Sequence, residues 1–501
     1  MSSYNDFTSF LSASFKYDTI PIYQSFFLDT VTPIKAFQLF QEEATFLLES
    51  KDDSSTWNRY SFIGLHPFLS IEGRESLQII GKENSILHDC KTIQEAFQCS
   101  LNMLKVAPLS MEIPFLGGAV GYISYDYITT LEKVSPHPKC QNENLVNLQF
   151  CETVIVLDHK TNMVTIIHYI RLKGLETKLE KEKMYQRGKA EINRCATQLN
   201  KRNEDEMFVS EESNEHFPIQ FKSSYTKEKF IQHVEIVKNY IRQGDIFQCV
   251  LAQKFSVELD IDGFDVYRVL RNVNPSPYLF YIKLSDRELI GSSPERLVEV
   301  KDRILEIHPI AGTRRRGKTK EDDERMGSEL LSDKKEQAEH VMLVDLARND
   351  IGKVAKFGSV HVSEFKKLVY FSKVMHIISI VKGELEKTKS PLDALLATFP
   401  AGTVSGAPKV RAMQIIQELE PVERNTYAGA ICYIGFDGNI DSCITIRTIE
   451  KKKDTFQIQA GAGIVADSIP ELEWKETNNK ARALLETLQI ANQLFQKEKR
   501  G

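Results

Sequence analysis

The stretch CYIGFDGNIDSCITIRTIEKKKDTFQIQAGAGIV, residues 432–465, decides the fold class of this chain. Its apolar and polar residues alternate in short runs that are rich in β-branched side chains, which is typical of β-strands. Gly438 and Asn439 lie between the first two runs and predict a tight turn. The stretch therefore predicts a hairpin and, with it, an antiparallel sheet.

Segments further along the chain in both directions predict helices and more strands. Residues 225–245 and 334–350 carry apolar residues at helical spacing. Residues 61–73 and 144–158 alternate like strands, and residues 115–127 have the glycine and aromatic content of a turn that leads into a strand. Helices and antiparallel strands together indicate an α+β fold.

A polar region separates the chain into two parts. Residues 172–202 carry charged side chains at helical spacing without a proline, and so predict a solvated helix. Residues 203–218 break this periodicity, as a surface loop or linker does. We expect an N-terminal domain over residues 1–220 and a C-terminal domain over residues 221–501, with their sheets intertwined.

The composition excludes several classes of function. Hydrophobic residues make up 42% of the 501 residues, and 64 lysines and arginines nearly balance 69 acidic residues, for a net charge of −5. So small a net charge argues against bulk binding to nucleic acid or to an anionic membrane. No apolar run approaches the roughly 18 residues of a membrane span. Because the N-terminus lacks a basic start followed by an apolar stretch, we expect a cytoplasmic protein.

Eight cysteines are scattered along the chain, and none forms a CxxC pair. The sequence therefore indicates neither a zinc ribbon nor a dithiol redox site. We expect reduced thiols that are buried as small apolar groups.

Two pairs of glutamates are spaced three residues apart in helical segments: Glu336 with Glu339, and Glu473 with Glu476. This spacing places both members of a pair on one helix face. On two facing helices, such carboxylates make an oxygen site suited to Mg²⁺, which keeps several waters and accepts substrate oxygens. The alternative is two solvated helix faces with lysines nearby, and spacing alone favours it.

Three small-residue loops are candidates for binding an anion: residues 311–317, 401–409 and 460–463. Glycines let backbone N–H groups approach an anion closely, and a following helix adds a favourable dipole. Thr403 and Ser405 are equally well explained as local capping residues. None of the loops has P-loop spacing. Together they favour a small anionic substrate over a nucleotide.

Two polar residues stand in apolar surroundings, His376 and Arg447. A histidine in an apolar run is more often a satisfied core residue than a catalyst. Arg447 lies in CITIRTIE, residues 443–450, which predicts a strand, and alternation places it on a face with neutral residues. It is either an outward charge or an inward carboxylate clamp, and alternation slightly favours the clamp.

Nine blocks in a fixed order resemble the signature of the chorismate-utilising enzymes. They are GSSPERLV, HPIAGTRRRG, AEHVMLVDLARNDIGKV, VMHIISIVKGEL, FPAGTVSGAPKVRAM, YAGAICYIGFDG, IRT, QAGAGIVADS and ExExxET, over roughly residues 225–490. LLES (Leu47–Ser50) and NPSPY (Asn274–Tyr278) are similar to the tryptophan-binding elements of anthranilate synthases. The resemblance implies the family's fold, a two-domain antiparallel-sheet sandwich with outer helices.

The resemblance also implies a chorismate site with Mg²⁺ as cofactor. Glu339 and Glu476 match the direct metal ligands of the family, with Glu336 and Glu473 around them. The metal would bind the ring carboxylate of chorismate, so the metal interpretation of the glutamate pairs becomes the stronger one. The positions that would bind the substrate are Arg447, Tyr427, Gly461, Gly463, Gly312 and Thr313.

Four catalytic positions follow from the same resemblance: Glu295, His376, Thr403 and Gln248. Glu295 lies where a nucleophile would be activated and is our candidate base for the incoming amine. His376 and Thr403 flank the ring in relatives. His376 is our candidate proton carrier for departure of the hydroxyl and elimination of pyruvate.

Two positions indicate the reaction. Relatives that add water carry a lysine at the position of Gln248, and aminodeoxychorismate synthases commonly carry one at the position of Ala311. A lysine amine activates water or attacks directly, whereas ammonia needs neither. We therefore expect an anthranilate synthase large subunit, a lyase that converts chorismate and ammonia to anthranilate and pyruvate in tryptophan biosynthesis. The alternatives are aminodeoxychorismate synthase component I and a non-catalytic tryptophan-sensing homologue.

The resemblance implies a partner and an inhibitor. No glutaminase motif is visible, so ammonia would come from a separate glutamine amidotransferase subunit, component II, in a heterotetramer. L-tryptophan would inhibit by feedback, although LLES alone is equally well explained as a helix end. The positions that would bind tryptophan are Glu49, Ser50, Pro275, Ser276, Tyr278 and Cys443. We expect no nucleic acid and no membrane as partners.

Overall fold

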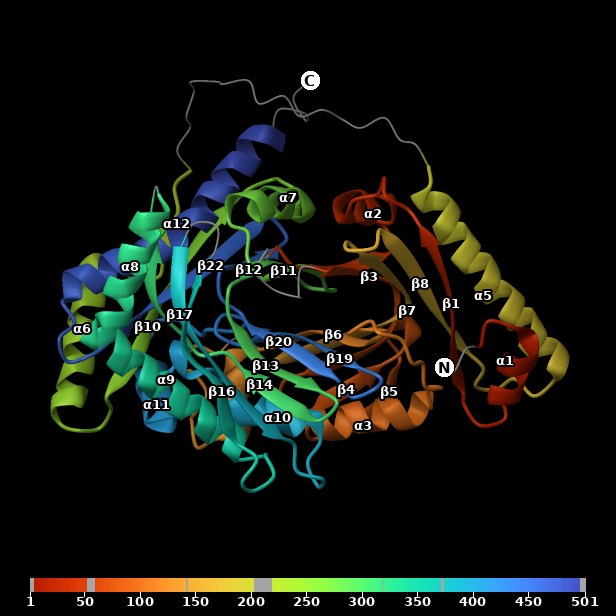
Figure 1. Cartoon of the computed structure of the whole chain (residues 1–501), viewed down its shortest axis with the longest axis horizontal. Coiled ribbons are helices and arrows are strands. Elements are labelled where there is room, and N and C mark those ends of the chain that lie inside the picture. The colour runs from red at the N-terminus through yellow and green to blue at the C-terminus, as the bar shows by residue number, and fades with distance from the viewer. Residues whose placement is uncertain are drawn as a thin grey trace.

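The computed structural model describes residues 4–51, 59–140, 143–201, 219–317, 319–370 and 374–495. Helices and antiparallel ladders alternate through these residues, and the longest ladders all run antiparallel. Figure 1 shows the helices on the outside, at the two ends and along the lower and upper sides of the strands. The α+β class with antiparallel sheet and outer helices is thereby confirmed.

The N-terminal part is a sheet of long strands with helices against it. Its elements are α1 (Phe7–Ala13), β1 (Thr19–Phe27), α2 (Pro33–Leu39), β2 (Ala44–Glu49), β3 (Tyr60–Gly73), β4 (Leu77–Ile80), η2 (Lys82–Asn84), β5 (Ile86–Cys90), α3 (Ile93–Leu104), β6 (Gly118–Ile123), η3 (Tyr125–Tyr127), α4 (Ile128–Leu131), β7 (Val146–Asp158), β8 (Met163–Arg171) and α5 (Lys178–Leu199). β7 pairs with β3 on one side and with β8 on the other, and β1 continues the sheet beyond β8.

The C-terminal part carries the helices that surround the later strands. Its elements are β9 (Lys222–Ser223), α6 (Lys227–Arg242), β10 (Gln248–Glu258), α7 (Gly263–Val273), β11 (Tyr278–Lys283), β12 (Glu288–Ser293), β13 (Arg296–Lys301), β14 (Ile304–Ile307), β15 (Ile310–Arg315), α8 (Lys320–Ser332), α9 (Lys334–Gly352), β16 (His361–Tyr370), β17 (Val374–Glu384), α10 (Pro391–Thr398), η4 (Gly402–Val404), β18 (Gly406–Ala407), α11 (Lys409–Leu419), β19 (Ala430–Gly435), β20 (Ile440–Ile444), β21 (Thr448–Lys452), β22 (Thr455–Ile464) and α12 (Pro470–Phe495). β10 pairs with β22, and β17 lies between β15 and β16.

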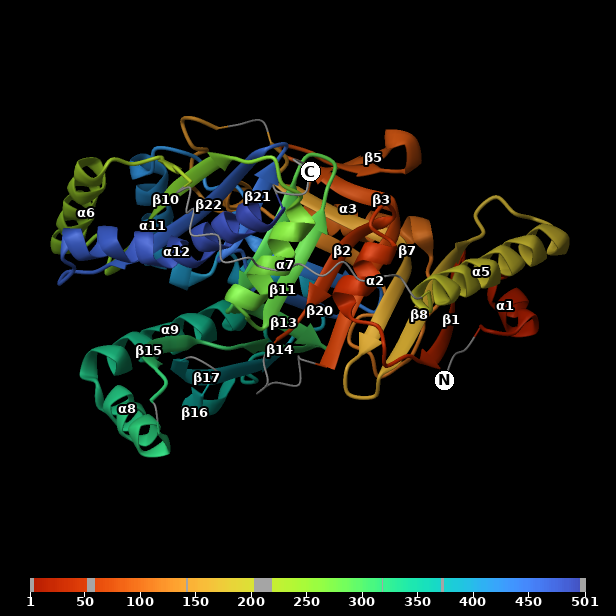
Figure 2. The same cartoon turned by 90° about the horizontal axis from the view of Figure 1, so that it is seen from above.

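Strands of the two parts pair directly with each other. β2 pairs with β11, with Glu49 opposite Leu279, and β6 pairs with β19, with Gly121 opposite Cys432. In Figure 2, β2 and β11 lie side by side near the middle of the molecule. The sheet is therefore continuous across the boundary expected at residue 220, and that boundary stays a prediction.

The helix predicted over residues 172–202 is α5. Thr177 begins it with a capping box, because its hydroxyl accepts from the Glu180 N–H at 3.2 Å and the Glu180 carboxylate accepts from the Thr177 N–H at 2.9 Å. The residues that α5 buries recur at helical spacing: Tyr185, Gly188, Ile192, Cys195 and Leu199. The other face stays solvated, as predicted. The linker predicted over residues 203–218 lies outside the described residues.

The predicted hairpin is formed by β19 and β20, with Ile434 opposite Ile440. Gly438 takes a φ of +86° in the turn, a conformation that suits glycine. The prediction of a continuous strand through Arg447 is wrong. β20 ends at Ile444 and β21 begins at Thr448, and Arg447 lies between them with a φ of +51°.

Backbone contacts from outside the hairpin hold this break. The Thr445 N–H donates to the Gly429 carbonyl at 2.9 Å, and the Arg447 carbonyl accepts from the Ser292 N–H at 3.0 Å. The chain therefore leaves the ladder and returns to it, so the alternation expected over residues 443–450 does not apply at Arg447. The alternative of a helix end at LLES is wrong as well. Leu47, Leu48 and Glu49 belong to the strand β2, which pairs with β3 and β11 on its two sides, and Ser50 follows the strand.

Apolar side chains from both parts of the chain share a core. Phe37 of α2 stacks on Phe264 of α7 with ring centroids 4.4 Å apart, and both rings are buried. A pair of this kind adds roughly 0.5–1.5 kcal/mol beyond the area it buries. Among the described residues, no helix combines the length and the apolar character needed to cross a membrane.

Candidate active site

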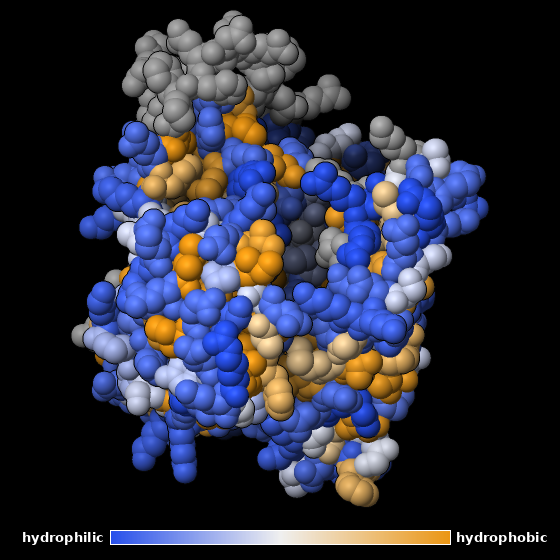
Figure 3. All heavy atoms as spheres, turned by 90° about the vertical axis from the view of Figure 1, so that its left-hand side faces the viewer, coloured by the Kyte–Doolittle hydropathy of each residue, from blue (hydrophilic) through white to orange (hydrophobic). Residues whose placement is uncertain are grey.

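A cavity of about 970 Å³ lies among β10, β15, β17 and β22 and the helices α9 and α12. Figure 3 views the molecule from the end that carries α6, α8 and α12, and shows a largely polar face that is hollowed. The residues singled out from the sequence that line the cavity are Gln248, Glu295, Ala311, Gly312, Glu339, His376, Thr403, Tyr427, Arg447, Gly461, Gly463 and Glu476. The fold thus brings together residues from distant blocks of the sequence.

Glu295 lies in the wall of the cavity, between β12 and β13. Its carbonyl accepts from the Ile444 N–H at 3.0 Å, which ties this segment to β20. Burial raises the pKa of the Glu295 carboxyl to about 7, and the Thr403 hydroxyl and the charge of Lys480 oppose that rise. A carboxyl with a pKa near neutrality both accepts and releases a proton readily, as a general base must.

The helices α9 and α12 each bring one glutamate to the cavity, Glu339 and Glu476. Burial raises the pKa of Glu339, and the nearby charges of Glu336 and Glu476 raise it further. Lys480 follows Glu476 by one turn and pairs with it at 2.8 Å. Carboxylates that repel one another in a half-buried place favour the uptake of a cation.

The other two glutamates of the expected metal group, Glu336 and Glu473, do not line the cavity. Glu336 pairs with Arg314 at 3.1 Å, and burial raises the pKa of Glu473 against a hydrogen bond from Ser468. Over the residues that the structure describes, no three of these carboxylates bring oxygen atoms within 4.8 Å of one another. The arrangement offers two carboxylates at the cavity and two outside its lining, not a closed cage of four.

Arg447 enters the cavity from the break between β20 and β21. Its guanidinium donates to the Lys480 carbonyl at 3.2 Å, and burial lowers its pKa. In the described part of the chain no carboxylate forms an ion pair with it. Burial also raises the pKa of the neighbouring Tyr427 hydroxyl, to about 12. A buried guanidinium that lacks an acidic partner is suited to bind the carboxylate of a ligand.

His376 lies in β17 opposite Thr313 of β15. Its Nδ1 lies 2.8 Å from the carbonyl oxygen of Gly312. Because a carbonyl only accepts, this contact places the ring proton on Nδ1 and leaves Nε2 unprotonated in the neutral ring. Burial lowers the pKa of His376, which favours that neutral form. The side chain of Thr313 lies outside the described residues.

Gly461 and Gly463 of β22 form part of the cavity wall, where a side chain would collide. A Cβ at Gly461 would stand 2.9 Å from the Tyr427 hydroxyl, and one at Gly463 would stand 2.8 Å from the Gln248 amide nitrogen. Backbone at these two positions is therefore accessible to a ligand in a way that a larger residue would prevent.

Sequence reasoning did not place two polar residues that line the cavity, Lys480 and Gln459. Lys480 follows Glu476 by four residues, so helical spacing puts both on one face of α12 and could have identified it. Gln459 precedes Gly461 by two residues of β22 and shares its side of the strand. Its buried amide has no hydrogen-bond partner among the described residues, which suits it to a ligand or a water.

A second cavity, of about 1150 Å³, lies beside the first. It is lined by Glu49, Ser50, Tyr278 and Cys443 of the expected tryptophan site, whereas Pro275 and Ser276 line the first cavity instead. Pro277 lines both. The segment that contains these prolines is thus the partition between the two cavities.

Hydrogen bonds fix both sides of this partition. The Glu49 carboxylate accepts from the Arg271 guanidinium at 2.8 Å and from the Tyr267 hydroxyl at 2.5 Å. The Lys51 N–H donates to the Ser276 carbonyl at 3.2 Å. LLES and NPSPY therefore meet in space, although Glu49 already has cationic and hydroxyl partners inside the protein.

Comparisons with known proteins all lead to one enzyme family. A family model described as chorismate binding enzyme matches residues 43–486. The chain is 52% identical to anthranilate synthase component 1 of Bacillus subtilis over 99% of its own length and 97% of that protein. It superposes on the crystal structure of anthranilate synthase component I from Streptococcus pneumoniae with a TM-score of 0.73 at 36% identity, covering 91% of this chain and 98% of that one. The menaquinone-specific isochorismate synthase MenF of Escherichia coli shares the fold, with a TM-score of 0.68 at 20% identity over 94% and 95% of the two chains.

Proposed function

The chain belongs to the family of chorismate-binding enzymes, among the anthranilate synthase component 1 proteins, and we propose that its cavity performs the anthranilate synthase reaction in the following way. Chorismate and ammonia become anthranilate and pyruvate, so the enzyme acts as a lyase. One observation carries the proposal. A single cavity joins the buried guanidinium of Arg447, the carboxyl of Glu295 with a pKa of about 7, and the carboxylates of Glu339 and Glu476. These groups complement a substrate with two carboxylates that must exchange protons.

Mg²⁺ is the cofactor that we assign to Glu339 and Glu476. Proteins usually hold this ion by one or two carboxylates, with waters and ligand oxygens completing the shell. The raised pKa of Glu339, to which Glu336 and Glu476 contribute, fits a place where a cation relieves repulsion among carboxylates. When bound, the ion would neutralise the ring carboxylate of chorismate.

Arg447 and Tyr427 would hold the enolpyruvyl carboxylate by charge-assisted hydrogen bonds. The backbone N–H groups of Gly461 and Gly463 would approach the ring carboxylate, because a side chain at either position would occupy that space. The substrate is then fixed at both of its acidic groups, which leaves the ring between Glu295 and His376.

The proposed reaction has two steps, amination of the ring and elimination of pyruvate. A bond forms between the ammonia nitrogen and C2 of chorismate while the bond from C4 to its hydroxyl breaks. Glu295 would take a proton from the nitrogen, and the hydroxyl would leave as water with the Nε2 proton of the charged form of His376, which becomes neutral by this transfer. C2 then loses its proton and the bond from C3 to the enolpyruvyl oxygen breaks, so enolpyruvate leaves an aromatic ring. Enolpyruvate takes up one proton from solvent at its methylene carbon to become pyruvate, and Glu295 returns its proton to solvent. The unprotonated Nε2 of His376 is suited to accept that C2 proton.

Ammonia is the expected nucleophile because the chain places no amine at the two positions that distinguish related reactions. Gln248 and Ala311 both line the cavity. A lysine at either position would supply the amine that activates water or attacks the ring. We propose that ammonia comes from a separate glutamine amidotransferase subunit.

Feedback inhibition by L-tryptophan is the regulatory part of the proposal. The second cavity supports it, because the hydroxyl of Ser50 is buried there and has no hydrogen-bond partner in the described part of the chain. Since Pro277 lines both cavities, an occupant of one can shift the wall of the other. Inhibition of this kind requires tryptophan to bind two states of the enzyme with different affinity.

The test uses the purified full chain with chorismate, Mg²⁺ and a high concentration of ammonium salt. Anthranilate fluorescence that disappears with EDTA and returns with Mg²⁺ is the expected result, and tryptophan should reduce it. A non-aromatic aminated product would assign the chain to the aminodeoxychorismate branch. A folded protein without turnover would contradict the proposed activity.

A further inference from the structure

We propose that His88, Cys90 and Cys99 form a binding site for a thiophilic divalent cation, Zn²⁺ in the first place, separate from the active site. One ring nitrogen and the two sulfur atoms all lie within 4.8 Å of one another. In a tetrahedral zinc site, ligand bonds of about 2.0–2.3 Å put neighbouring nitrogen and sulfur ligands roughly 3.5–3.8 Å apart. Small side-chain rotations therefore bring the three atoms to coordination distance.

Local structure holds the three side chains together. His88 and Cys90 are two residues apart on β5, so they point to the same side of the strand. The chain turns back at once, because the hydroxyl of Thr92 accepts from the Glu95 N–H at 3.2 Å and begins α3. α3 contacts β4 and β5 and carries Cys99 towards the strand (Figure 1). The site is thus assembled within a single strand–turn–helix unit.

The electrostatics favour a cation. The carboxylates of Asp89 and Glu95 act electrostatically on the Cys90 sulfur. The charged groups that act on this thiol are acidic, so a dication would be attracted to the place. Soft thiolate ligands select zinc over the hard Mg²⁺ of the active site.

A second cluster of possible metal ligands is already occupied by an arginine. Glu43, His66 and Glu191 also bring ligand atoms within 4.8 Å of one another. The guanidinium of Arg194 already pairs there with Glu43 at 2.5 Å and with Glu191 at 2.7 Å. A cation would have to displace this arginine, whereas the cluster on β5 and α3 has two thiols to offer.

Binding exchanges protons for metal in a defined ratio. One Zn²⁺ joins the neutral imidazole of His88 and the two sulfur atoms, and the thiols of Cys90 and Cys99 release one proton each. Because two protons leave, the affinity should rise about 100-fold per pH unit while both thiols are protonated in the free protein. Among the described strands, β5 pairs with β4 alone, so the bound ion would fasten an edge strand to α3.

The experiment uses the full chain, reduced, stripped of metal by a chelator, and then kept in excess Mg²⁺ so that the carboxylates of the active site are occupied. Co²⁺ serves as the spectroscopic probe, because only a thiolate ligand gives it a sulfur-to-metal charge-transfer band. Zn²⁺ retained after gel filtration is counted by mass spectrometry. We expect one equivalent of Zn²⁺ and the charge-transfer band in the unaltered chain.

The variants locate the site. Cys99→Ser should weaken the band, because only the Cys90 thiolate remains, and should bind Zn²⁺ about 100-fold more weakly, whereas His88→Ala, at an exposed position, should weaken binding without affecting folding. Cys140→Ser alters an exposed cysteine elsewhere and should leave both readouts unchanged. A Co²⁺ complex without the band, or equal Zn²⁺ retention by Cys99→Ser and the unaltered chain, would overturn the proposal. Anthranilate formation with Mg²⁺ should be the same in Cys99→Ser, and its loss in a folded variant would contradict a separate site.

Discussion

At the scale of single residues, backbone conformation gives Arg447 its role. Its φ of +51° is unusual for a residue with a side chain and turns the guanidinium into the cavity. Such a conformation costs on the order of 1–3 kcal/mol and persists only where the surroundings enforce it. The contact between Ser292 and the Arg447 carbonyl is one of those that do. The strain is consistent with a residue placed to bind a ligand.

Replacing Arg447 by Ala should lower kcat/KM by roughly 100-fold or more, about 3 kcal/mol, because a charge-assisted contact to the substrate is lost. Arg447→Lys should recover little, because an ammonium lacks the planar pair of donors. Steady-state kinetics with chorismate measures both. Arg348→Ala, at an exposed surface pair, is the control and should behave as the unaltered chain. Equal kcat/KM in Arg447→Ala and Arg348→Ala would rule out the clamp.

The pKa of Glu295 predicts a pH dependence. The base acts as a carboxylate, and burial raises its pKa to about 7, so kcat/KM should rise as pH increases through neutrality and level off above it. The concentration of unprotonated ammonia must be held constant at each pH, since it changes in the same direction. Glu295→Gln should lose this rise, and Glu386→Gln, at an exposed position, should retain it. A profile of Glu295→Gln that matches the unaltered chain would assign the base elsewhere.

His376→Ala should reduce anthranilate formation by about 10²–10⁴-fold, the usual contribution of a positioned acid or base. The hydrogen bond to Gly312 is lost as well, so circular dichroism and thermal unfolding must show that β15 and β17 stay paired. His361→Ala changes an exposed histidine of β16 and serves as the matched control. Unchanged anthranilate output from a folded His376→Ala protein would exclude its proposed role.

At the scale of elements, the proposed metal site depends on the approach of the helices α9 and α12. Each helix alone presents glutamates at a spacing that is also common on solvated surfaces. Only their approach places Glu339 near the charge of Glu476, which together with burial and the neighbouring Glu336 raises its pKa. The proposed metal site therefore depends on how α9 and α12 are placed relative to each other, and not on either helix alone.

Glu339→Gln should abolish stabilisation by Mg²⁺ while leaving the metal-free protein at least as stable. The sign follows from the raised pKa of Glu339, because at neutral pH its charge is less favourable in the folded state than in the unfolded one. Thermal unfolding with and without Mg²⁺ measures both effects. Glu471→Gln, an exposed change on α12, should keep the full response to Mg²⁺. A normal Mg²⁺ response in Glu339→Gln would remove this residue from the ligand set.

The helices near the site and the hairpin were predictable, because each is encoded by its own periodicity. The helices α6 and α9 and the hairpin of β19 and β20 appear where the pattern of residues placed them. Two stretches expected as loops, residues 311–317 and 460–463, lie instead mostly in the strands β15 and β22. The break at Arg447 was not predictable, because contacts with Ser292 and with the segment around Gly429 impose it from outside. Residue types identified Arg447 and His376 as candidates, and family resemblance assigned their roles. Their meeting in one cavity required the three-dimensional structure.

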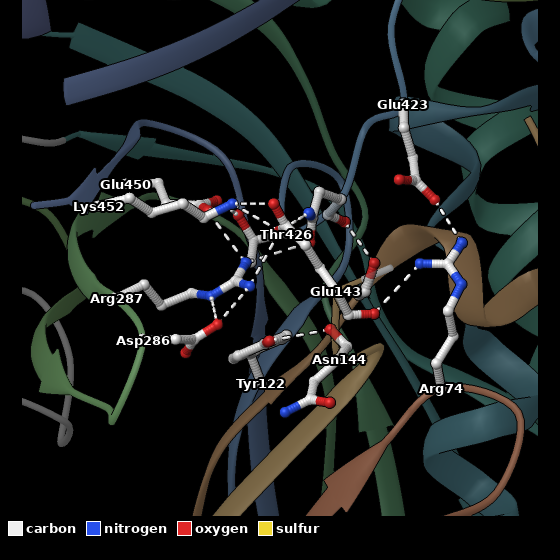
Figure 4. Close-up of polar contacts among 12 residues, drawn as sticks. Arg74, Tyr122, Glu143, Asn144, Asp286, Arg287, Glu423, Thr426, Glu450 and Lys452 are labelled. Carbon is white, nitrogen blue, oxygen red and sulfur yellow. Dashed lines mark hydrogen bonds and ion pairs between the residues drawn. The ribbon is translucent and has the colours of Figure 1, made fainter. Parts of the chain in front are cut away.

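At the scale of the whole molecule, a buried polar network holds distant segments together. The side chain of Arg287 is 0% exposed and pairs with Asp286 at 2.7 Å and with Glu143 and Glu450 at 2.9 Å each. Figure 4 shows Arg287 surrounded by these carboxylates, with Lys452 approaching from the same side as Glu450. The network joins the start of β7 to the turn before β12 and to β21. No local pattern in the sequence could predict pairs so far apart.

Arg287→Met should destabilise the fold by about 3–5 kcal/mol, because it removes the buried cation that Glu143 and Glu450 share with Lys452 and leaves Lys452 alone to balance both. Arg348→Met removes a pair with Asp345 in which both side chains are more than half exposed, and should cost under about 1 kcal/mol. Urea unfolding of the two variants measures the difference. Similar losses in both variants would mean that the network contributes no more than a surface pair.

The activity proposed for this cavity is to join ammonia to chorismate and to release pyruvate. The most direct measurement supplies the purified chain with chorismate, Mg²⁺ and ¹⁵N-labelled ammonium, and follows the label by mass spectrometry together with the amount of pyruvate. We expect labelled anthranilate and pyruvate in equal amounts, both lost in Arg447→Ala. A labelled product that retains the enolpyruvyl group, or anthranilate formation that survives Arg447→Ala undiminished, would contradict this proposal.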